Sequence, residues 1–454
     1  MPAEHIEATL RVTRADGATD PELSSLRRRL DQLADPGAGM LPGESLTPLP
    51  DLPRLAELPE PEDPRDLLDR VAVVKVNGGL GTSMGLTAPK SLLQVKPGNS
   101  FLDVLAAQVL GVRERHGTRL PLLLMNSRTT REPSLAALDA YPALAQQDSL
   151  PRDFLQGREP KLRADDQMPV QWPADPSLEW CPPGHGDLYT ALAASGTLEA
   201  LLDAGVRWLF ASNADNLGAV VDARIPAWMA ATHAPFVMEA VRGTAADRKG
   251  GHLALRDGQV VLRETAQVPK GDATFTDVDR WRYYNSNNLW IDLEALRALQ
   301  VEQPGGPDLP LIVNRKTVDP RDPDSTPVLQ LETAMGAAIG EIPGARALEV
   351  PRTRFAPVKT TDDLLVVRSD AYELTGDGRM EPTFTGPGPV VTLDREHYKQ
   401  LPDLERHFPR GAPGLRSARS LRVDGPVTFG AGVQIEGDVH LTGPMTVPDG
   451  EVLS

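Results

Sequence analysis

The residues best suited to chemistry lie in one glycine-rich stretch, NGGLGTSMGLTAPKS, at positions 77–91. Residues 78–85 include four glycines, and Pro89-Lys90 follows them. Closely spaced glycines let the backbone approach a ligand and point several N–H groups at it. A lysine beside such a loop can neutralise an anion held there. The stretch therefore predicts a phosphate-binding loop rather than a plain surface turn.

Two common phosphate-binding motifs do not fit this stretch. The dinucleotide fingerprint needs the spacing G-x-G-x-x-G, and Gly79, Gly81 and Gly85 are one residue too long for it. The Walker A motif needs a glycine before its Lys-Ser/Thr pair, where this chain has Pro89. Proline lacks an N–H and disfavours the helical conformation in the residue before it. A Rossmann dehydrogenase and a P-loop NTPase are both disfavoured.

The elements around the loop indicate how it is positioned. The run VAVVKV at 71–76 is apolar and β-branched, which is typical of a strand buried on both faces. Similar runs at 120–125, 207–212 and 235–241 predict further buried strands, and 101–116 has the apolar spacing of a helix. Alternating strands and helices predict an α/β core with a largely parallel sheet. Such sheets bind ligands at the carboxyl ends of their strands.

Other polar residues are candidates for the same edge. Asp215 directly follows a buried strand; hard oxygen ligands suit Mg²⁺, but an aspartate there is as readily a helix N-cap. His185 lies in the loop PPGHG, where a lone histidine is more often a solvated residue than a ligand contact. The amides of Asn285, Asn287 and Asn288 offer the paired donors and acceptors that suit sugar hydroxyls, although asparagine is also common in turns.

The two ends of the chain differ from its middle. Residues 1–70 predict one short amphipathic helix near 23–33, followed by a proline-rich extended connector. Residues 421–454 carry apolar residues six apart, with Gly425, Gly437 and Gly443 at the same period. This period predicts a β-helix of hexapeptide repeats. So short an array must pack on the core or on another subunit, and its apolar last residues favour a homo-oligomer contact.

Composition limits the partners. The net charge of −16 disfavours nucleic acid and anionic membranes as partners, because both need clustered positive charge, but leaves small phosphates open. The single cysteine, Cys181, excludes an internal disulfide framework. The sequence shows neither a run of 18 apolar residues nor a basic-then-apolar start, so we expect a cytoplasmic protein.

The motifs of the middle region resemble those of the eukaryotic-type UTP–glucose-1-phosphate uridylyltransferases. The resemblance begins with VVKVNGGLGTSMGLTAPKS and continues in order along roughly residues 70–370. The later matching stretches are LLLMNS, FLQGREPKL, WCPPGHGDLY, FASNADNLGA, KGGHLALRDGQVVLRETAQVPK, YYNSNNLWI, QLETAMGAAI and RFAPVKTTDDLLVV.

The resemblance implies a fold and a division of the chain. The expected fold is a Rossmann-like nucleotidyltransferase core with a mixed, mainly parallel sheet, followed by a C-terminal left-handed β-helix of hexapeptide repeats. The expected segments are 1–70, an N-terminal helical and proline-rich part; 71–370, the catalytic domain; 371–420, a connector; and 421–454, the β-helix.

The resemblance also implies a reaction: the uridylyl group of UTP is transferred to glucose 1-phosphate, with Mg²⁺ as cofactor, giving UDP-glucose and pyrophosphate. Lys90 and Lys359 match the phosphate-binding lysines, and Asp215 matches the metal ligand. The other matched positions are substrate contacts: Val76, Asn77, Gly78, Gly79, Gln156, Gly184, His185, Asn213 and Asn287.

Two rival interpretations remain at this point. A related pyrophosphorylase could use N-acetylglucosamine 1-phosphate or galactose 1-phosphate, although the form NGGLGTSMG favours glucose. A non-catalytic nucleotide sensor could share the fold. A sensor has no need of Lys90, Asp215 and Lys359 together, and all three are present.

Overall fold

A computed structural model describes residues 1–35, 39–145, 150–244, 247–386 and 388–454. Its largest sheet has nine strands in this described part, with the order β12-β11-β13-β9-β1-β4-β5, and β10 pairs with β13 and β16. The strands are β1 (Val71–Asn77), β4 (Leu122–Asn126), β5 (Asp153–Leu155), β9 (Trp208–Asn213), β10 (Phe236–Arg242), β11 (His252–Arg256), β12 (Gln259–Arg263), β13 (Tyr283–Asp292) and β16 (Arg346–Glu349).

The central sheet is mixed rather than mainly parallel. Its parallel pairings are β1 with β4 and β9, β4 with β5, and β10 with β16. Its antiparallel pairings are β10 with β13, β11 with β12 and β13, and β13 with β9. The sequence prediction overstated the parallel share because the second half of the sheet is built on a hairpin and on the long strand β13. Asp257 and Gly258 form the turn of this hairpin, both with positive φ.

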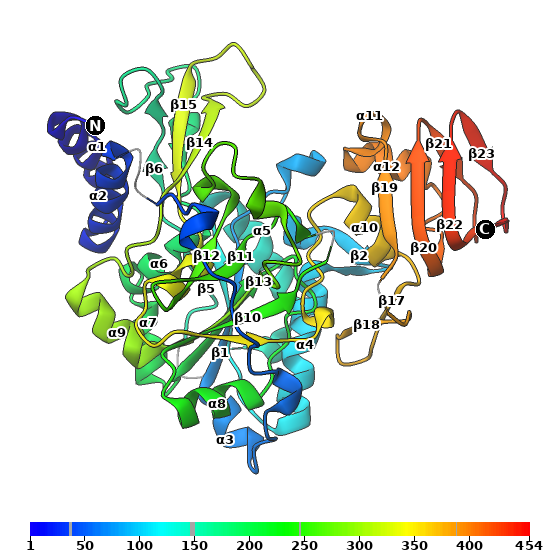
Figure 1. Ribbon diagram of the computed structural model, residues 1–454, viewed down its shortest axis with the longest axis horizontal. Helices are drawn as coiled ribbons and strands as arrows, with labels where there is room; N and C mark the ends of the chain where they lie inside the picture. The colour runs from blue at the N-terminus through cyan, green and yellow to red at the C-terminus, as the bar shows by residue number, and fades with distance from the viewer. Residues whose placement is uncertain (36–38, 146–149, 245–246, 387) are drawn as a thin grey trace.

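Helices cover both faces of this sheet, as the nearly continuous burial of β1 requires. Val71 and Val73 face one apolar cluster, and Ala72 and Val74 face another. The first cluster takes residues from α4 (Phe101–His116), α5 (Arg128–Leu138) and α8 (Arg224–Thr232). The second takes residues from α6 (Leu188–Ala194), α7 (Thr197–Asp203) and α9 (Leu293–Glu302). The result is a three-layer core, at the centre of Figure 1.

The N-terminal segment begins with two helices where the sequence analysis expected one. These are α1 (Ala3–Ala15) and α2 (Asp20–Ala34), drawn in dark blue in Figure 1. They lie beside a small sheet formed by β7 (Leu162–Arg163), β14 (Ile312–Thr317) and β15 (Pro327–Glu332). Leu23, Leu26 and Leu30 pack with Leu329 and Leu331 of that sheet. The helix α1 was missed because only Ile6 and Leu10 among its large apolar residues are buried.

The C-terminal segment packs on the core through one apolar cluster. Helix α10 (Thr361–Arg368) leads to the short strands β17 (Tyr372–Leu374) and β18 (Met380–Pro382), then to α11 (Arg395–Tyr398) and α12 (Leu401–His407). The last strands are β19 (Val390–Leu393), β20 (Gly414–Asp424), β21 (Val427–Phe429), β22 (Gln434–Thr442), β23 (Met445–Val447) and β24 (Val452–Leu453). Met84 of the glycine-rich stretch belongs to the same cluster as these elements.

The predicted left-handed β-helix of hexapeptide repeats is wrong. In the described residues the last strands form a four-stranded sheet, β19-β20-β22-β24, and a separate pair, β21-β23, with no left-handed β-helix. Strands β20 and β22 are 11 and 9 residues long, so each runs past the length of one hexapeptide face. Gly437, predicted as a corner, lies inside β22 opposite Ala418. Gly425 and Gly443 do lie between strands, but Gly437 does not, so the six-residue period does not mark a turn at every repeat.

The predicted homo-oligomer contact through that β-helix has no support in this arrangement.

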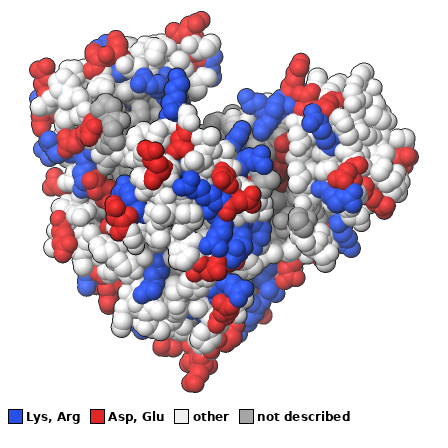
Figure 2. Space-filling view, in the orientation of Figure 1, with Lys and Arg blue, Asp and Glu red and all other residues white. Residues whose placement is uncertain are grey.

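The remaining short elements are α3 (Pro64–Leu68), β2 (Gln94–Lys96), β3 (Asn99–Ser100), β6 (Glu159–Pro160) and β8 (Trp180–Cys181). No helix among the described residues is long and apolar enough to cross a membrane. On the face shown in Figure 2, the surface is hollowed between the β14–β15 projection and the C-terminal strands, and Lys and Arg side chains border the hollow.

Candidate active site

The candidate site lies where four parallel strands end. Asn77 at the end of β1 pairs with Asn126 of β4, and Val76 pairs with Asn213 of β9. Strand β5 ends at Leu155, directly before Gln156. Because parallel strands end at one edge, the segments after them lie next to one another there. The fold therefore places the glycine-rich loop between the segments that carry Gln156 and Asp215.

The glycine-rich loop is held in one shape by its own backbone. Gly81 and Gly85 have φ values of +68° and +73°, in the left-handed region that favours glycine, and flank a tight turn at Thr82–Met84. The N–H of Lys90 donates to the carbonyl of Gly79 at 3.2 Å, which closes the loop. Gly79 is exposed, with no other segment within 4 Å of the Cβ that an alanine would add. A ligand can therefore approach its backbone.

Lys90 and Asp215 form the ion pair at the centre of the site. Lys90 Nζ lies 2.5 Å from Asp215 Oδ2, and it also donates to the carbonyl of Val358. The two side chains are 16% and 20% exposed, so both remain open to a ligand. The structure thus brings together two residues that the sequence analysis placed in one site from separate motifs.

Gly78, Gln156 and Gly184 also meet. The Cβ that an alanine would add at Gly78 would lie 2.6 Å from Gln156 Oε1, so a larger residue there would displace the end of that side chain. Gln156 Nε2 donates to the carbonyl of Gly184 at 2.7 Å. By contrast, the side chain of Asn77 is buried and donates to Asn126 Oδ1 and Ser134 Oγ. Asn77 thus braces the end of β1, and only its backbone can reach a ligand.

His185 is half-buried and held in a defined orientation. Its Nδ1 accepts a hydrogen bond from the N–H of Met335 at 3.0 Å, so the neutral ring carries its proton on Nε2. Burial, together with the positive charge of Lys359, lowers the pKa of His185 to about 4. Near neutral pH the His185 side chain is therefore uncharged, and its Nε2–H is a hydrogen-bond donor. Its acceptor nitrogen, Nδ1, is already occupied by the N–H of Met335.

Asn287 is presented by an irregularity in β13. The pairing of β13 with β10 shifts register at this point, and Asn287 has a φ of +56°. Asn285 fixes this backbone: its Oδ1 accepts from the N–H of Asn287, and its Nδ2 donates to Asn287 Oδ1, both at 2.8 Å. Such local amide bonds are what allow asparagine to adopt positive φ. The amide cluster predicted from the sequence is a bulge that exposes Asn287.

The residues of the site fit a divalent cation that draws most of its ligands from a substrate. Asp215 Oδ1 is buried and makes no hydrogen bond in the described part of the chain, while Oδ2 is held by Lys90. Within the described residues no group of three or more histidine, cysteine, aspartate or glutamate side chains could hold a metal. A single free carboxylate oxygen suits Mg²⁺, which takes one or two carboxylates and otherwise keeps waters and phosphates.

Known proteins with the same architecture decide the family. A profile described as UTP–glucose-1-phosphate uridylyltransferase matches residues 38–436. The UTP–glucose-1-phosphate uridylyltransferase of Saccharomyces cerevisiae is 40% identical over 393 residues, which is 85% of this chain and 77% of the yeast protein. The chain belongs to the UTP–glucose-1-phosphate uridylyltransferase family. The family reaction joins UTP and glucose 1-phosphate and gives UDP-glucose, and members depend on a divalent metal.

Solved structures of this uridylyltransferase family extend the match to the whole chain. The UDP-glucose phosphorylase of Trypanosoma brucei has a TM-score of 0.91 at 41% identity and covers 99% of this chain and 98% of its own. A variant of the UDP-glucose pyrophosphorylase of Leishmania major, solved in complex with UDP-glucose, has a TM-score of 0.93 at 39% identity. That pair covers 100% of this chain and 98% of the Leishmania chain.

The structure adds one candidate that the sequence analysis did not single out. Glu264 directly follows β12 and lies near Asn285 and Lys359. Burial raises the pKa of Glu264, and the nearby charge of Lys359 opposes this shift. The available signal was the same as for Asp215, a carboxylate directly after a buried strand.

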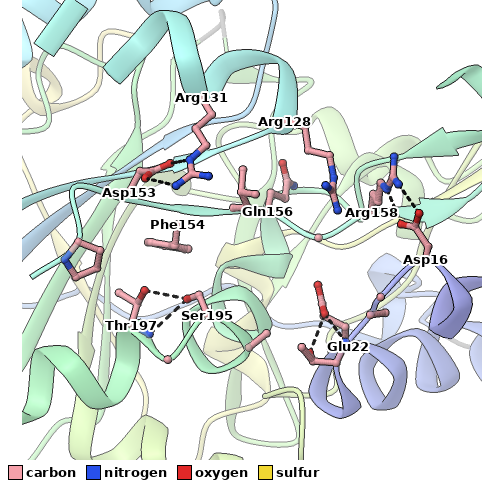
Figure 3. A pocket seen from close by; sticks show the side chains of 18 of the residues that line it. Asp16, Glu22, Arg128, Arg131, Asp153, Phe154, Gln156, Arg158, Ser195 and Thr197 are labelled. Carbon is pink, nitrogen blue, oxygen red and sulfur yellow. Dashed lines mark hydrogen bonds and ion pairs between the residues drawn. The ribbon is translucent and has the colours of Figure 1, made fainter. Parts of the chain in front are cut away.

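A separate cavity of about 520 Å³ lies on the far side of Gln156 (Figure 3). Its wall includes Gln156 and Arg128 but none of Lys90, Asp215 and Lys359. Two ion pairs close its sides: Arg131 with Asp153, and Arg158 with Asp16. This cavity is therefore distinct from the place where charge is gathered for the uridylyl transfer.

Gly184→Ala tests how tightly the His185 loop is held. Gly184 has a φ of +79°, and an added Cβ would lie 2.5 Å from the carbonyl oxygen of Thr333. We expect a loss of about 1–3 kcal/mol in the free energy of unfolding and at least a tenfold lower kcat/KM, since the loop must shift. The control is Gly196→Ala, where φ is +72° but no atom lies within 4 Å. Urea unfolding measures the stability and pyrophosphate release measures kcat/KM. If the two variants lose the same stability and have the same kcat/KM, the His185 loop is not held as tightly as described.

The lowered pKa of His185 predicts a pH dependence of stability. An unfolded chain binds the proton with a pKa of about 6.5, whereas the folded chain binds it only near 4. The unfolded state therefore binds more protons in this window, and stability is lost as the pH falls through it. Relative to His185→Asn, we expect the parent to lose roughly 2 kcal/mol more between about pH 7 and about pH 5. Parallel urea-unfolding curves for the two proteins would show the prediction to be wrong.

Proposed function

We propose that this chain makes UDP-glucose and pyrophosphate at the edge formed by β1, β4, β5 and β9, with Mg²⁺ as the divalent ion. The observation that carries this proposal is the contact of Lys90 with Asp215 beside the glycine-rich loop, which leaves Asp215 Oδ1 free. The substrates are UTP and glucose 1-phosphate. The net charge of −16 disfavours nucleic acid and anionic membranes as partners.

The chemistry is an in-line attack of a phosphate oxygen of glucose 1-phosphate on the α-phosphorus of UTP. This nucleophile is already anionic near neutral pH, because the second pKa of a phosphate monoester is about 6. No general base is required. The protein must hold two polyanions together and neutralise the charge that builds up on the leaving pyrophosphate. Mg²⁺ bound through Asp215 would supply part of that neutralisation.

The cationic side chains supply the rest. Lys90 is held against the loop by its bonds to Asp215 and to the carbonyl of Val358, so its charge is already in place when a triphosphate binds. Lys359 is exposed, and its charge is felt by both His185 and Glu264. It therefore lies near both, and we assign it to the phosphate of the sugar. Charges fixed in advance cost no reorganisation during the reaction.

The remaining contacts divide between the base and the sugar. Backbone groups of Val76, Asn77, Gly78 and Gly79, with Gln156 and Gly184, form the uridine side. His185 Nε2 and Asn213 face the sugar phosphate, and Asn287 and Glu264 supply amide and carboxylate groups for sugar hydroxyls. We assign Glu264 to the sugar because it lies near Asn285, which holds Asn287.

Substrate profiling tests this function. Pyrophosphate release should be fastest with UTP and glucose 1-phosphate, and slower with the 1-phosphates of N-acetylglucosamine and galactose. CTP should be rejected by as much as about 10⁴ in kcat/KM, because its base reverses the donor and acceptor that Gln156 and Gly184 would meet. Activity restricted to another sugar 1-phosphate would favour that rival, and binding of UTP without turnover would favour a sensor. The proposal includes a cytoplasmic enzyme, in keeping with the single, buried thiol of Cys181.

Charge removal tests the assigned roles. Lys90→Ala, Lys359→Ala and Asp215→Ala should each lower kcat by roughly 10²–10³, the usual loss for one group that stabilises transition-state charge. Lys316→Ala removes an exposed lysine from β14, outside the site, and should leave kcat unchanged. A loss smaller than about threefold in any of the first three variants would remove that residue from the mechanism.

A further inference from the structure

Asn216 directly follows Asp215, and its buried side-chain amide makes hydrogen bonds beneath the site. It is 1% exposed. Its Nδ2 donates to Asn288 Oδ1 at 3.0 Å and to the carbonyl of Arg354 at 3.1 Å. Its Oδ1 accepts from the N–H groups of Ala356 at 3.0 Å and Gly218 at 3.3 Å. Every donor and acceptor of this amide is therefore satisfied, which fixes its orientation.

The partners of Asn216 belong to segments that carry the substrate contacts. Asn288 follows Asn287 in β13. Arg354 and Ala356 lead to Val358, whose carbonyl holds Lys90, and then to Lys359. The backbone of Asn216 also forms an isolated bridge to Pro357. The side-chain amide of Asn216 thus joins the Asp215 loop to β13, which carries Asn287, and to residues 354–359, which carry Lys359.

The partners of the Asn216 side chain, Asn288 and Arg354, are themselves held in place by Glu239. Glu239 is fully buried, and its Oε2 accepts from Asn288 Nδ2 at 3.0 Å and from Arg354 Nε at 2.7 Å. Its Oε1 accepts from Trp290 Nε1 at 2.9 Å. Because Glu239 takes the donor end of Asn288, the acceptor end must face Asn216. The carboxylate therefore orients the partner that Asn216 meets.

The loop itself is held closely from below. Lys75 is buried, and its Nζ donates to Ser212 Oγ at 2.7 Å and to the carbonyl of Ala219 at 2.9 Å, one at each end of the loop. A Cβ added at Gly218 would lie 2.3 Å from the carbonyl oxygen of Thr353. With its ends fixed and no room at Gly218, the loop can change its relation to Lys90 only if several bonds break, and those of Asn216 are the side-chain bonds that tie it to both β13 and residues 354–356.

We infer that Asn216 is a positioning residue that sets the Asp215 carboxylate against Lys90 and the segment 354–359. The inference rests on the proposed role of Asp215. Residues that orient a metal ligand from behind typically change metal affinity or activity by about 10-fold to 100-fold when removed. A residue that only stabilised the fold would lower the melting temperature without this effect.

The test uses Asn216→Ala and the milder Asn216→Ser, which keeps one hydroxyl for hydrogen bonding. We expect kcat to fall about 10-fold to 100-fold in the alanine variant and less in the serine variant. Mn²⁺ binding in the presence of UDP-glucose, followed by electron paramagnetic resonance, should weaken in the same order. The KM for UTP should stay within about twofold of the parent, because the uridine side is built on Gln156 and Gly184.

The matched control is Gln108→Ala. Gln108 is another buried amide, and its Nε2 donates to the carbonyl of Leu217 in the same loop at 2.8 Å, but it has no bond to β13 or to 354–359 in the described structure. It should lower the melting temperature while kcat and Mn²⁺ binding stay near the parental values.

The outcomes separate this inference from the proposed function. If Asn216→Ala and Asn216→Ser match Gln108→Ala in kcat and Mn²⁺ binding, while Asp215→Ala loses both, the positioning role is overturned and the proposed function stands. If Asp215→Ala itself keeps turnover and Mn²⁺ binding, the proposed function fails, and the inference fails with it. If Asn216→Ala does not fold, a loss of Mn²⁺ binding by folded Asn216→Ser supports the role, and parental binding overturns it.

Discussion

The contact between Lys90 and Asp215 is the interaction on which the site depends. The two residues are 125 positions apart and meet because β1 and β9 are parallel neighbours that end at the same edge. A mostly buried ion pair of this kind is weak evidence for stability, because the cost of taking both charges out of water offsets much of their attraction. Its value here is that it keeps a cation and a carboxylate side by side, ready for a triphosphate and a metal ion of opposite charges. Substrate binding then exchanges partners among charges that are already in place.

Much of the surrounding structure maintains that contact. The buried bonds of Asn216 and Lys75 fix the Asp215 loop, and the carbonyl of Val358 fixes the amine of Lys90. Buried polar networks are costly unless every member is paired, so such a network has few alternative arrangements. The site is rigid on its floor, and its open side is formed by glycine backbone and by long side chains such as Lys359.

The sequence analysis placed Lys90 and Asp215, which meet in the structure, in one site because their signals are local. A buried strand followed by a glycine loop and Pro89-Lys90 can be recognised in a few residues, and so can Asp215 after a later buried strand. The sequence could not show that Asn77 is committed to bracing β1, that Asn285 forces Asn287 into a positive φ, or that Asn216 lies beneath the site. Those facts depend on which distant segment each amide meets. The C-terminal six-residue period led to a wrong prediction for the same reason. The spacing identified the inward-facing residues of stacked strands, but strand length and sheet pairing decide whether a left-handed β-helix forms. Among the described residues none does.

A double-mutant cycle on Lys90 and Asp215 tests the central claim most directly. The kcat/KM for pyrophosphate release would be measured for the parent, Lys90→Ala, Asp215→Ala and the double variant, at one fixed Mg²⁺ concentration. If the two residues act as one unit on the same developing charge, the losses are strongly non-additive. The double variant should then lie within about tenfold of the worse single variant. Losses that multiply across the two sites would contradict the account, because they would show that Lys90 and Asp215 act independently.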